Sequence, residues 1–380
     1  MGRVYDLAVV GGGILGLAHA FVAARSGLRV VLIERDRVAN GASIRNFGFI
    51  TVTGQERGTS WQLARRTRDI WVELAARADI AVEHKGLYLA ARSAEALAVI
   101  EAFLATEMGE ACKLLSAEAF RAASGGLGGR DLAGALYSPH EIRVESRFAI
   151  ARLTAFLIEQ MGVTVLSGTA VHEVSPPRLI TSRGKVEAAQ VVICPGDDFT
   201  TLYPERIAAY GLTRCRLSML RLASPGLRLP GAIMSDLGLV RYRGYGALPE
   251  ARALEARLRA ELPRHFDNGV HLIVAQGADD SLIVGDSHHY ADVPMPFAPA
   301  SAEDDILDEY VRALGGPVPK VIERWTGTYA VAADRTFLID EPEDNVRLVI
   351  VTSGTGASTG FGIAEKVLGD LAGLNQGAMA

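Results

Sequence analysis

The sequence predicts an α/β protein in which both ends of the chain form a nucleotide-binding domain and a more β-rich domain is inserted between them. Three observations lead to this prediction. A glycine-rich turn near the N-terminus lies between a β-branched run and a helical pattern. A similar strand, turn and helix pattern closes the chain, and the middle alternates short apolar runs with Pro-Gly turns.

The composition is that of a folded globular protein. Of 380 residues, 49% are hydrophobic and 22% are charged, and 39 Lys and Arg against 44 Asp and Glu give a formal net charge of −5. These values exclude a disordered or fibrous chain and provide no basic excess with which to bind nucleic acid. The apolar stretch at residues 7–10 is far shorter than a membrane span, so we expect no membrane partner.

Cysteine is scarce, with only Cys112, Cys194 and Cys215. A sparse, odd set argues against a disulfide framework and is typical of a reducing compartment, so the cytoplasm is the expected location. No pair has the spacing of metal ligands and no histidine-rich cluster compensates, so no metal site is expected.

The first seventy residues predict a strand, a turn, a helix and a second strand, followed by a long amphipathic helix. Residues 4–10, 17–26 and 29–33 form a βαβ unit of about 30 residues, and residues 61–78 carry apolar side chains at helical spacing. Further helices are expected at 94–110, 147–161, 251–262, 302–314 and 363–374, strands at 163–165, 191–194, 217–222, 270–275, 282–284 and 347–352, and a hairpin around Arg183-Gly184.

The N-terminal turn has the spacing of a dinucleotide-binding site. Gly11 permits a tight turn, Gly13 lets the backbone approach a pyrophosphate, and Gly16 lets the helix pack closely on the strand. Glu34 ends the second strand 18 residues after Gly16, where a carboxylate can bind a ribose hydroxyl. This carboxylate disfavours the 2′-phosphate of NADP, so NAD and FAD remain.

The C-terminal turn Ser353-Gly354-Thr355-Gly356 favours FAD. A long cofactor can use two helix N-termini, one for its pyrophosphate and one near a reactive ring that becomes anionic on reduction. The alternative is that this turn is a plain loop.

The chain resembles the D-amino acid oxidase, glycine oxidase and sarcosine oxidase family of FAD-dependent amine oxidoreductases over nearly its whole length. The resemblance rests on residues 9–16, on Glu34-Arg35, and on the segments at 41–48, 136–139, 144–145, 191–196 and 354–362. It implies a Rossmann-like FAD-binding domain of residues 1–85, 145–205 and 323–380. It also implies an inserted α+β substrate domain of residues 86–144 and 206–322, built on an antiparallel sheet.

The resemblance also implies which residues hold FAD. The expected set is Gly11, Gly13, Ile14, Leu15, Gly16, Glu34, Arg35, Ala42 and Ser43 for the ADP half, Val171 at the adenine, Arg45, Asn46, Phe47 and Gly48 along the flavin ring, Gly354, Gly356, Ser358 and Thr359 at its pyrimidine edge, and also Gly196. Some relatives attach FAD through a cysteine in the C-terminal third. Because no cysteine follows Cys215, we expect non-covalent FAD.

One departure from the family pattern concerns the substrate. Many amino-acid-oxidising relatives carry Gly-Leu-Arg-Pro where this chain has Gly327-Thr328-Tyr329-Ala330, and that arginine clamps a carboxylate. A tyrosine hydroxyl does not replace the charge of an arginine fork. The chain is also similar to a bacterial subgroup associated with aminophosphonate breakdown, in segments 45–48, 215–221 and 285–288.

Tyr329, His288 and Arg45 are therefore the candidate catalytic residues, with Arg243 as a further cation for a substrate anion. The competing interpretation is that these side chains are structural. An enzyme of this family transfers a hydride from a neutral amine to the flavin, and the imine hydrolyses to a carbonyl compound and an amine.

The favoured function is oxidation of the C–N bond of a small zwitterionic amine, with an aminophosphonate of the 2-aminoethylphosphonate type, N-methylated, as substrate and molecular oxygen as a candidate acceptor. The alternatives are a glycine, sarcosine or D-amino acid oxidase, an NAD-dependent hydroxy acid dehydrogenase, and a nucleotide-binding sensor without catalysis.

Overall fold

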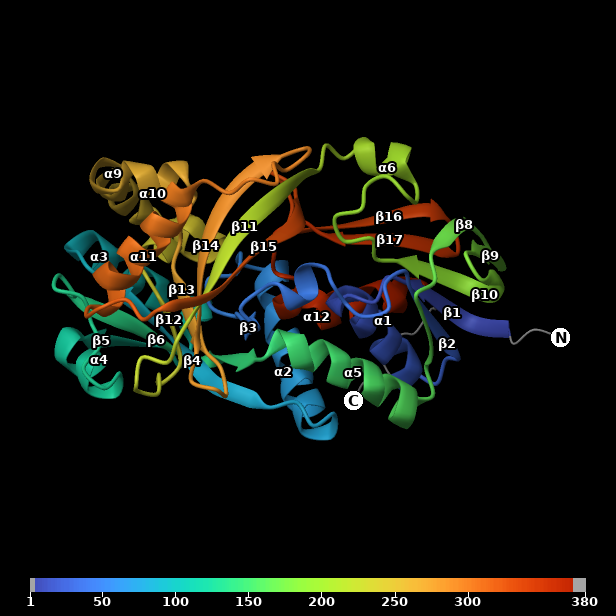
Figure 1. Ribbon diagram of the computed structural model, residues 1–380, viewed down its shortest axis with the longest axis horizontal. Coiled ribbons are helices and arrows are strands. Elements are labelled where there is room, and N and C mark those ends of the chain that lie inside the picture. Colours follow the sequence, from blue (N-terminus) through green and yellow to red (C-terminus); the bar gives the residue numbers. More distant parts are fainter. Residues whose placement is uncertain (1–3, 372–380) are drawn as a thin grey trace.

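The structure is a computed structural model that describes residues 4–371. Two sheets lie at opposite ends of its long axis, the first on the right of Figure 1 and the second on the left. Within the described residues, no helix is both long and apolar enough to cross a membrane.

The first sheet has the strand order β16-β17-β10-β1-β2-β7, and its five strands β17, β10, β1, β2 and β7 run parallel. Val10 of β1 is in register with Ile193 of β10 and with Ile33 of β2, so the carboxyl ends of these three strands meet at one edge. The strands are β1 (Val4–Val10), β2 (Val30–Glu34), β7 (Thr164–Ser167), β8 (Val171–Ser175), β9 (Arg178–Thr181), β10 (Gly184–Ile193), β16 (Phe337–Glu343) and β17 (Val346–Val351).

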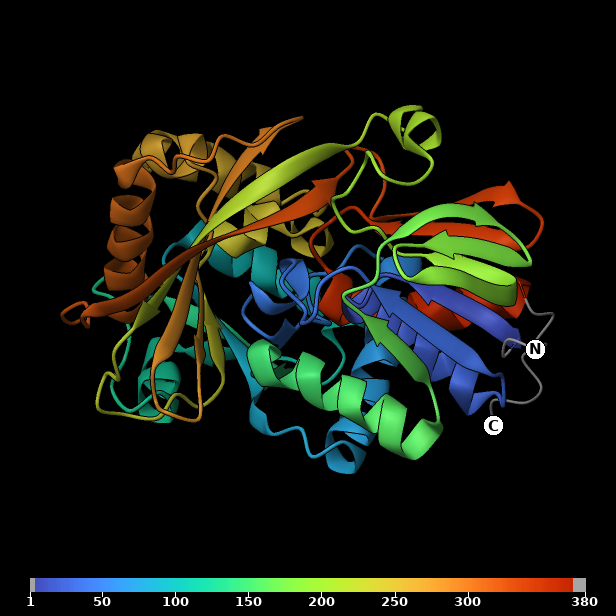
Figure 2. The same cartoon turned by 45° about the vertical axis from the view of Figure 1, so that its right-hand side comes forward.

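Helices cover one face of this sheet, and the hairpin of β8 and β9 with the short helix α6 covers the other (Figure 2). Helix α1 packs against α12 and α5, and α12 packs against α2. The core between them is apolar, with Trp71 and Phe361 in edge-to-face contact. The helices are α1 (Ile14–Arg25), α2 (Thr59–Arg77), α5 (Ser146–Met161), α6 (Pro204–Ala208) and α12 (Gly356–Leu371).

The second sheet is mostly antiparallel, with the order β15-β11-β14-β13-β12-β4-β6-β3 and β5 beside β6. The pair of β12 and β4 is parallel. Its strands are β3 (Phe49–Ile50), β4 (Val82–Ala91), β5 (Lys113–Ser116), β6 (Gly134–Val144), β11 (Thr213–Leu222), β12 (Ala232–Met234), β13 (Ile273–Gln276), β14 (Leu282–Ala291) and β15 (Val321–Val331).

Most helices associated with this sheet lie on its outer side, away from the first sheet (Figure 1). They are α3 (Ala94–Leu104), α4 (Ala117–Ala123), α7 (Leu237–Arg241), α8 (Arg243–Gly246), α9 (Ala251–Glu261), α10 (Pro263–Asp267) and α11 (Ala300–Leu314), with the 3₁₀ turns η1 (Ala42–Ile44) and η2 (Glu107–Gly109) elsewhere along the chain. The expected combination of a Rossmann-like α/β half with a largely antiparallel sheet is confirmed.

The predicted domain boundaries remain a prediction, although the two sheets largely follow them. Strands β3 and β15 belong to the second sheet, at the two ends of its strand order. The prediction places β3 and most of β15 in the nucleotide-binding half, which it assigns to residues 1–85, 145–205 and 323–380. Because β15 leads directly toward β16, one continuous segment joins the two halves at this point.

Most predicted elements are present, and three differ. The helix expected at 94–110 ends at Leu104, because the Thr106 side chain accepts the N–H of Met108 and begins a 3₁₀ turn. Only Ile273–Gln276 of the strand expected at 270–275 forms β13. The last helix begins at Gly356, seven residues before the expected start, and the expected residues 372–374 lie outside the described residues.

Candidate functional site

A cavity of about 650 Å³ lies between the two sheets. One end is lined by the glycine turn after β1, the end of β2 and the start of β8. The other end is lined by side chains of α7, β14 and β15 and of the segment before β13. The open edge of a parallel sheet, where the carboxyl ends of strands meet, is the usual ligand position in α/β proteins.

The first glycine turn leaves no room for side chains. Gly11 has φ of +108°, and a Cβ there would lie 2.3 Å from the carbonyl oxygen of Cys194. A Cβ on Gly16 would lie 1.8 Å from the Gly11 carbonyl oxygen. Helix α1 begins at Ile14 without a side-chain cap on Gly13. The Ile14 N–H donates to Ser43, so the N–H groups of the residues that follow it are the ones available to a phosphate.

Glu34 is fixed at the end of β2 beside this turn. Its Oε2 accepts the N–H of Gly12 at 2.6 Å and its Oε1 accepts the N–H of Asp36 at 2.8 Å. A carboxylate has about four acceptor positions, so a ribose hydroxyl can still donate to it. These residues fit the adenosine and pyrophosphate part of a dinucleotide.

The predicted cofactor residues converge on this cavity, although their roles stay a prediction. Ser43 in η1 accepts the N–H of Ile14 at 2.9 Å, and Arg35 pairs with Asp198 at 2.6 Å. The structure places two of the predicted residues behind the cavity wall: a Cβ on Gly48 would lie 1.7 Å from the Val144 carbonyl oxygen, and the Thr359 hydroxyl donates to Thr355 O. The remaining predicted positions line the wall: Gly11, Gly13, Ile14, Leu15, Gly16, Glu34, Arg35, Ala42, Ser43, Arg45, Asn46, Phe47, Val171, Gly196, Gly354, Gly356 and Ser358.

The second glycine turn joins β17 to α12, and the N-terminus of α12 faces the cavity. The Ser358 hydroxyl accepts the N–H of Thr51, and the indole of Trp71 donates to the Ala357 carbonyl at 2.9 Å. These two hydrogen bonds therefore fix the turn to Thr51, the residue after β3, and to Trp71 of α2. It supplies the second helix N-terminus that a long cofactor needs.

A cation and three phenol hydroxyls are found at the far end of the cavity. Arg241, the last residue of α7, donates to the Tyr290 hydroxyl at 2.9 Å. No carboxylate among the described residues forms an ion pair with it. Burial opposes its charge, but Tyr290, Tyr329 and Asp286 outweigh that effect and keep its pKa raised. Burial raises the pKa of Tyr329 and Tyr242, so both hydroxyls stay protonated and can donate.

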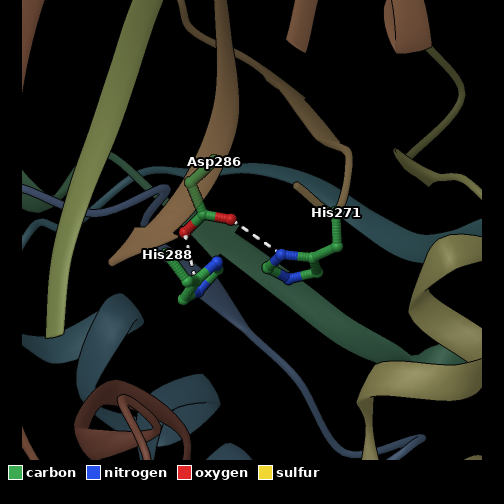
Figure 3. A group of neighbouring side chains, drawn as sticks. All are labelled: His271, Asp286 and His288. Carbon is green, nitrogen blue, oxygen red and sulfur yellow. Dashed lines mark ion pairs between the residues drawn. The ribbon is translucent and has the colours of Figure 1, made fainter. Parts of the chain in front are cut away.

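Two histidines flank a carboxylate on the same wall (Figure 3). His271 Nδ1 lies 2.8 Å from Asp286 Oδ1, and His288 Nε2 lies 3.6 Å from Asp286 Oδ2. All three side chains are buried. Burial opposes the charge of Asp286, but His288, His271 and Arg241 outweigh it and lower the pKa of this carboxyl group.

The three predicted catalytic residues have different surroundings. Tyr329 and His288 lie in this end of the cavity. Arg45 lines the cavity but donates to Asn40 Oδ1 at 3.0 Å and to Thr326 O at 3.4 Å. Arg243 donates to the Ala333 carbonyl at 2.7 Å and lies 3.5 Å from Glu56, so its charge is partly engaged.

Sequence reasoning missed Arg241, His271 and Asp286. Sequence spacing gave no sign of a histidine and carboxylate cluster, because His271 precedes β13 whereas Asp286 lies within β14, 15 residues later. Arg241 is two residues from Arg243 in the sequence. Only the fold shows that Arg241 donates to a tyrosine hydroxyl in the cavity, whereas Arg243 donates to the Ala333 carbonyl. Asp286 was the one available signal, because it lies in segment 285–288, on which the similarity to the bacterial subgroup rests.

Several solved structures share this fold. The glycine oxidase of Bacillus cereus ATCC 14579 is 18% identical, with a TM-score of 0.78 over 99% of this chain and 97% of that one. The L-proline dehydrogenase of P. horikoshii is 15% identical, with a TM-score of 0.77 over 97% and 93%. The L-α-glycerophosphate oxidase of Mycoplasma pneumoniae with FAD bound is 14% identical, with a TM-score of 0.74 over 97% and 95%. No curated protein matches the sequence.

The model of the family described as "FAD dependent oxidoreductase" matches residues 6–369. This match decides between FAD and NAD, which the first glycine turn left open. The chain therefore belongs to the FAD-dependent oxidoreductase family and is an enzyme whose cofactor is FAD.

Proposed function

We propose that this enzyme oxidises the C–N bond of a small amine that also carries an anionic group, and that this group is a phosphonate. The observation that carries the proposal is Arg241, a cation at the far end of the cavity with no carboxylate partner among the described residues. Within residues 4–371, Arg241 makes no direct ion pair, and Asp286 is the carboxylate that favours its charge from a greater distance. An anionic ligand therefore supplies the direct partner that a largely desolvated cation lacks.

The donors around Arg241 favour a tetrahedral anion over a planar one. An arginine fork alone matches a carboxylate bidentately. Here the guanidinium shares its end of the cavity with the hydroxyls of Tyr242, Tyr290 and Tyr329. These tyrosines come from three separate segments: the residue between α7 and α8, strand β14 and strand β15. Three phosphonate oxygens accept donors from several directions, whereas two coplanar carboxylate oxygens leave some of them unused.

When bound, FAD supplies a two-electron acceptor for the oxidation. The residues of the chain bind, orient and desolvate the substrate. Arg241 and the tyrosines would hold the anion, and Phe47 and Leu217 would form apolar walls beside the reacting carbon. Because no cysteine follows Cys215, we also propose that FAD is held non-covalently and is released by acid precipitation.

A glycine, sarcosine or D-amino acid oxidase is the second candidate, favoured by the similarity to the glycine oxidase fold. In that case Arg241 would clamp a carboxylate in place of the arginine that Tyr329 replaces. Molecular oxygen is the proposed electron acceptor in either case.

The test is anaerobic reduction of the bound flavin by glycine, sarcosine, D-alanine, 2-aminoethylphosphonate and its N-methyl form. We expect bleaching of the flavin band by the phosphonates at concentrations where the amino acids have no effect. Bleaching by sarcosine or an amino acid alone would replace the phosphonate proposal with the second candidate. If no amine reduces the flavin, the proposed amine oxidation is wrong.

A further inference from the structure

Resting on the proposed function, we infer that Asp286 and His288 form the subsite for the amine of the substrate, and that His288 Nε2 accepts the proton that this amine loses before oxidation. Four features of the cavity wall support this role. They are two acceptor atoms without a hydrogen-bond partner among the described residues, the tautomer of His288, the position of His271, and the charges around Asp286 and His288.

Two acceptor atoms face each other across a short gap. Asp286 Oδ2 and His288 Nε2 are 3.6 Å apart, which is too far for a direct hydrogen bond. Neither atom hydrogen-bonds to any residue in the part of the chain that the structure describes. Both residues line the cavity although each is no more than 6% exposed. A small donor group in the cavity can therefore contact both atoms.

The hydrogen bond on the other side of His288 identifies its open nitrogen as an acceptor. His288 Nδ1 lies 2.8 Å from the Gly269 carbonyl oxygen, which can only accept, so this nitrogen carries the hydrogen. Burial lowers the pKa of His288 well below its ordinary value, so the ring is neutral and Nε2 presents a lone pair. A group that binds both the carboxylate oxygen and the nitrogen lone pair must donate two hydrogens, and a positive charge strengthens its contact with the carboxylate.

An ammonium group has these properties. A primary or N-methyl ammonium offers at least two N–H bonds, one for each acceptor, whereas a tertiary ammonium offers only one. Arg241 belongs to the same end of the cavity and influences the ionisation of Asp286. The cavity thus presents one cation and one carboxylate, which complement the anion and the ammonium of a zwitterionic substrate.

His271 holds the carboxylate from its other side. Its Nδ1 lies 2.8 Å from Asp286 Oδ1, and its ring lies 5.5 Å from the ring of Tyr242. The titratable groups around His288 are Asp286, His271, Tyr290 and Arg241, from β14, the segment before β13 and the end of α7, and Tyr242 faces His271. His271 is a positioning residue, because it acts through Asp286.

The proton transfer balances without a further reactant. One N–H bond of the ammonium breaks, its electron pair stays on nitrogen, and the proton bonds to His288 Nε2. The imidazolium that forms lies beside the Asp286 carboxylate, which stabilises it as a carboxylate stabilises the histidine of a catalytic triad. The neutral amine can then give up a hydride, which an ammonium cannot.

The test compares Asp286→Asn, His288→Gln and the control His289→Gln in the FAD-loaded enzyme. His289 is the next residue on β14, but it hydrogen-bonds to Asn268 and does not line the cavity. Two ligands are titrated into each variant and followed by the flavin spectrum: the amine that reduces the wild-type flavin, and ethylphosphonate, which has the anion without the amine.

We expect Asp286→Asn to weaken amine binding about 10- to 100-fold, the effect of losing a hydrogen bond to a charged group, and to leave ethylphosphonate binding unchanged. His288→Gln should slow flavin reduction at neutral pH by about 10²- to 10⁴-fold, as expected for loss of a general base. In that variant the rate should rise with pH toward the pKa of the free amine, and the control should keep the wild-type profile.

Three results would overturn the inference while the proposed function survives. Equal weakening of both ligands by Asp286→Asn would make the cluster structural. An unchanged pH profile in His288→Gln would remove the proton acceptor. One tightly bound divalent metal per wild-type chain, lost in both variants, would make the two histidines and the carboxylate a metal site. Absence of flavin reduction in the wild type by every amine would instead overturn the proposed function and this inference with it.

Discussion

Gly354 lies so close to Tyr329 that a Cβ on this glycine would be 3.0 Å from Cζ of the tyrosine ring. Gly354 belongs to the turn before α12, and Tyr329 belongs to β15 of the second sheet. The contact therefore joins the turn predicted to hold the flavin edge to the residue that replaces the family's substrate arginine. The position of Tyr329 depends on the absence of a side chain at residue 354.

Replacing this glycine tests that dependence. Gly354 has φ of +72°, so Gly354→Ala introduces both backbone strain of about 1–2 kcal/mol and a clash with the Tyr329 ring. We expect a lower free energy of unfolding in urea and slower flavin reduction. Gly27→Ala is the matched control, because Gly27 has φ of +83° and lies outside the cavity, and a Cβ there would meet no atom within 4 Å, so the substitution introduces the strain without the clash. Equal effects of the two substitutions would show that the Tyr329 contact is unimportant.

A buried histidine beneath the first glycine turn makes stability depend on pH. His19 lies in α1, its Nδ1 donates to the Leu15 carbonyl at 2.7 Å, and burial lowers its pKa to about 4. The native ring stays neutral between pH 6.5 and 4, while the unfolded chain takes up a proton. The stability that His19 contributes is complete above pH 6.5 and is lost as pH falls to about 4, a change of about 3 kcal/mol.

The measurement is the free energy of unfolding at pH 7, 5.5 and 4 in the wild type and His19→Gln. We expect the substitution to remove this part of the pH dependence, because glutamine does not titrate. His172→Gln, on the exposed part of β8, should retain the full wild-type slope. A His19→Gln variant with that same slope would contradict the assignment.

A buried arginine holds α7, the helix that ends at Arg241. Arg92 donates to Glu309 at 2.7 Å and to Asp236 at 3.0 Å, and Asp236 is the residue just before α7. Arg92→Met leaves the buried Asp236 without an ion pair and Glu309 with only Arg312, 3.8 Å away, so we expect a loss of about 3–5 kcal/mol of stability. The control Arg57→Met breaks an exposed pair with Glu107 and should have a much smaller effect in the same denaturation experiment. A small loss for Arg92→Met would mean that the carboxylates become protonated or hydrated.

The cofactor half of the site was predictable because its signals are local. Gly11, Gly16 and Glu34 lie within one βαβ unit, where spacing fixes geometry, and the structure places them together at one sheet edge. The substrate half was predictable only in part: Tyr329 and His288 were named from the sequence, but Arg241, His271 and Asp286 were missed because they come from three separate segments. The pairing of β11 with both β14 and β15, and of β14 with β13, brings the strand segments side by side, and α7 adds Arg241 to the same cavity.

The long strands β4, β6 and β15 were also missed as strands. Residues such as Glu83, Lys85 and His84 interrupt the apolar pattern of β4, and the register shifts between Val82 and His84 and between Lys85 and Leu87 break its two-residue period. His84 is nonetheless buried, and this burial is the main reason why its pKa is lowered to about 3. Periodicity fails where a tertiary contact buries a polar side chain.

Titration of the FAD-loaded enzyme with ethylphosphonate measures whether Arg241 binds the substrate anion. We compare the wild type, Arg241→Met and the control Arg252→Met, which changes an exposed arginine on α9. We expect Arg241→Met to raise the dissociation constant about 10- to 100-fold, while the control matches the wild type. Equal affinity in Arg241→Met and the wild type would show that the anion is held elsewhere and that Arg241 does not bind it.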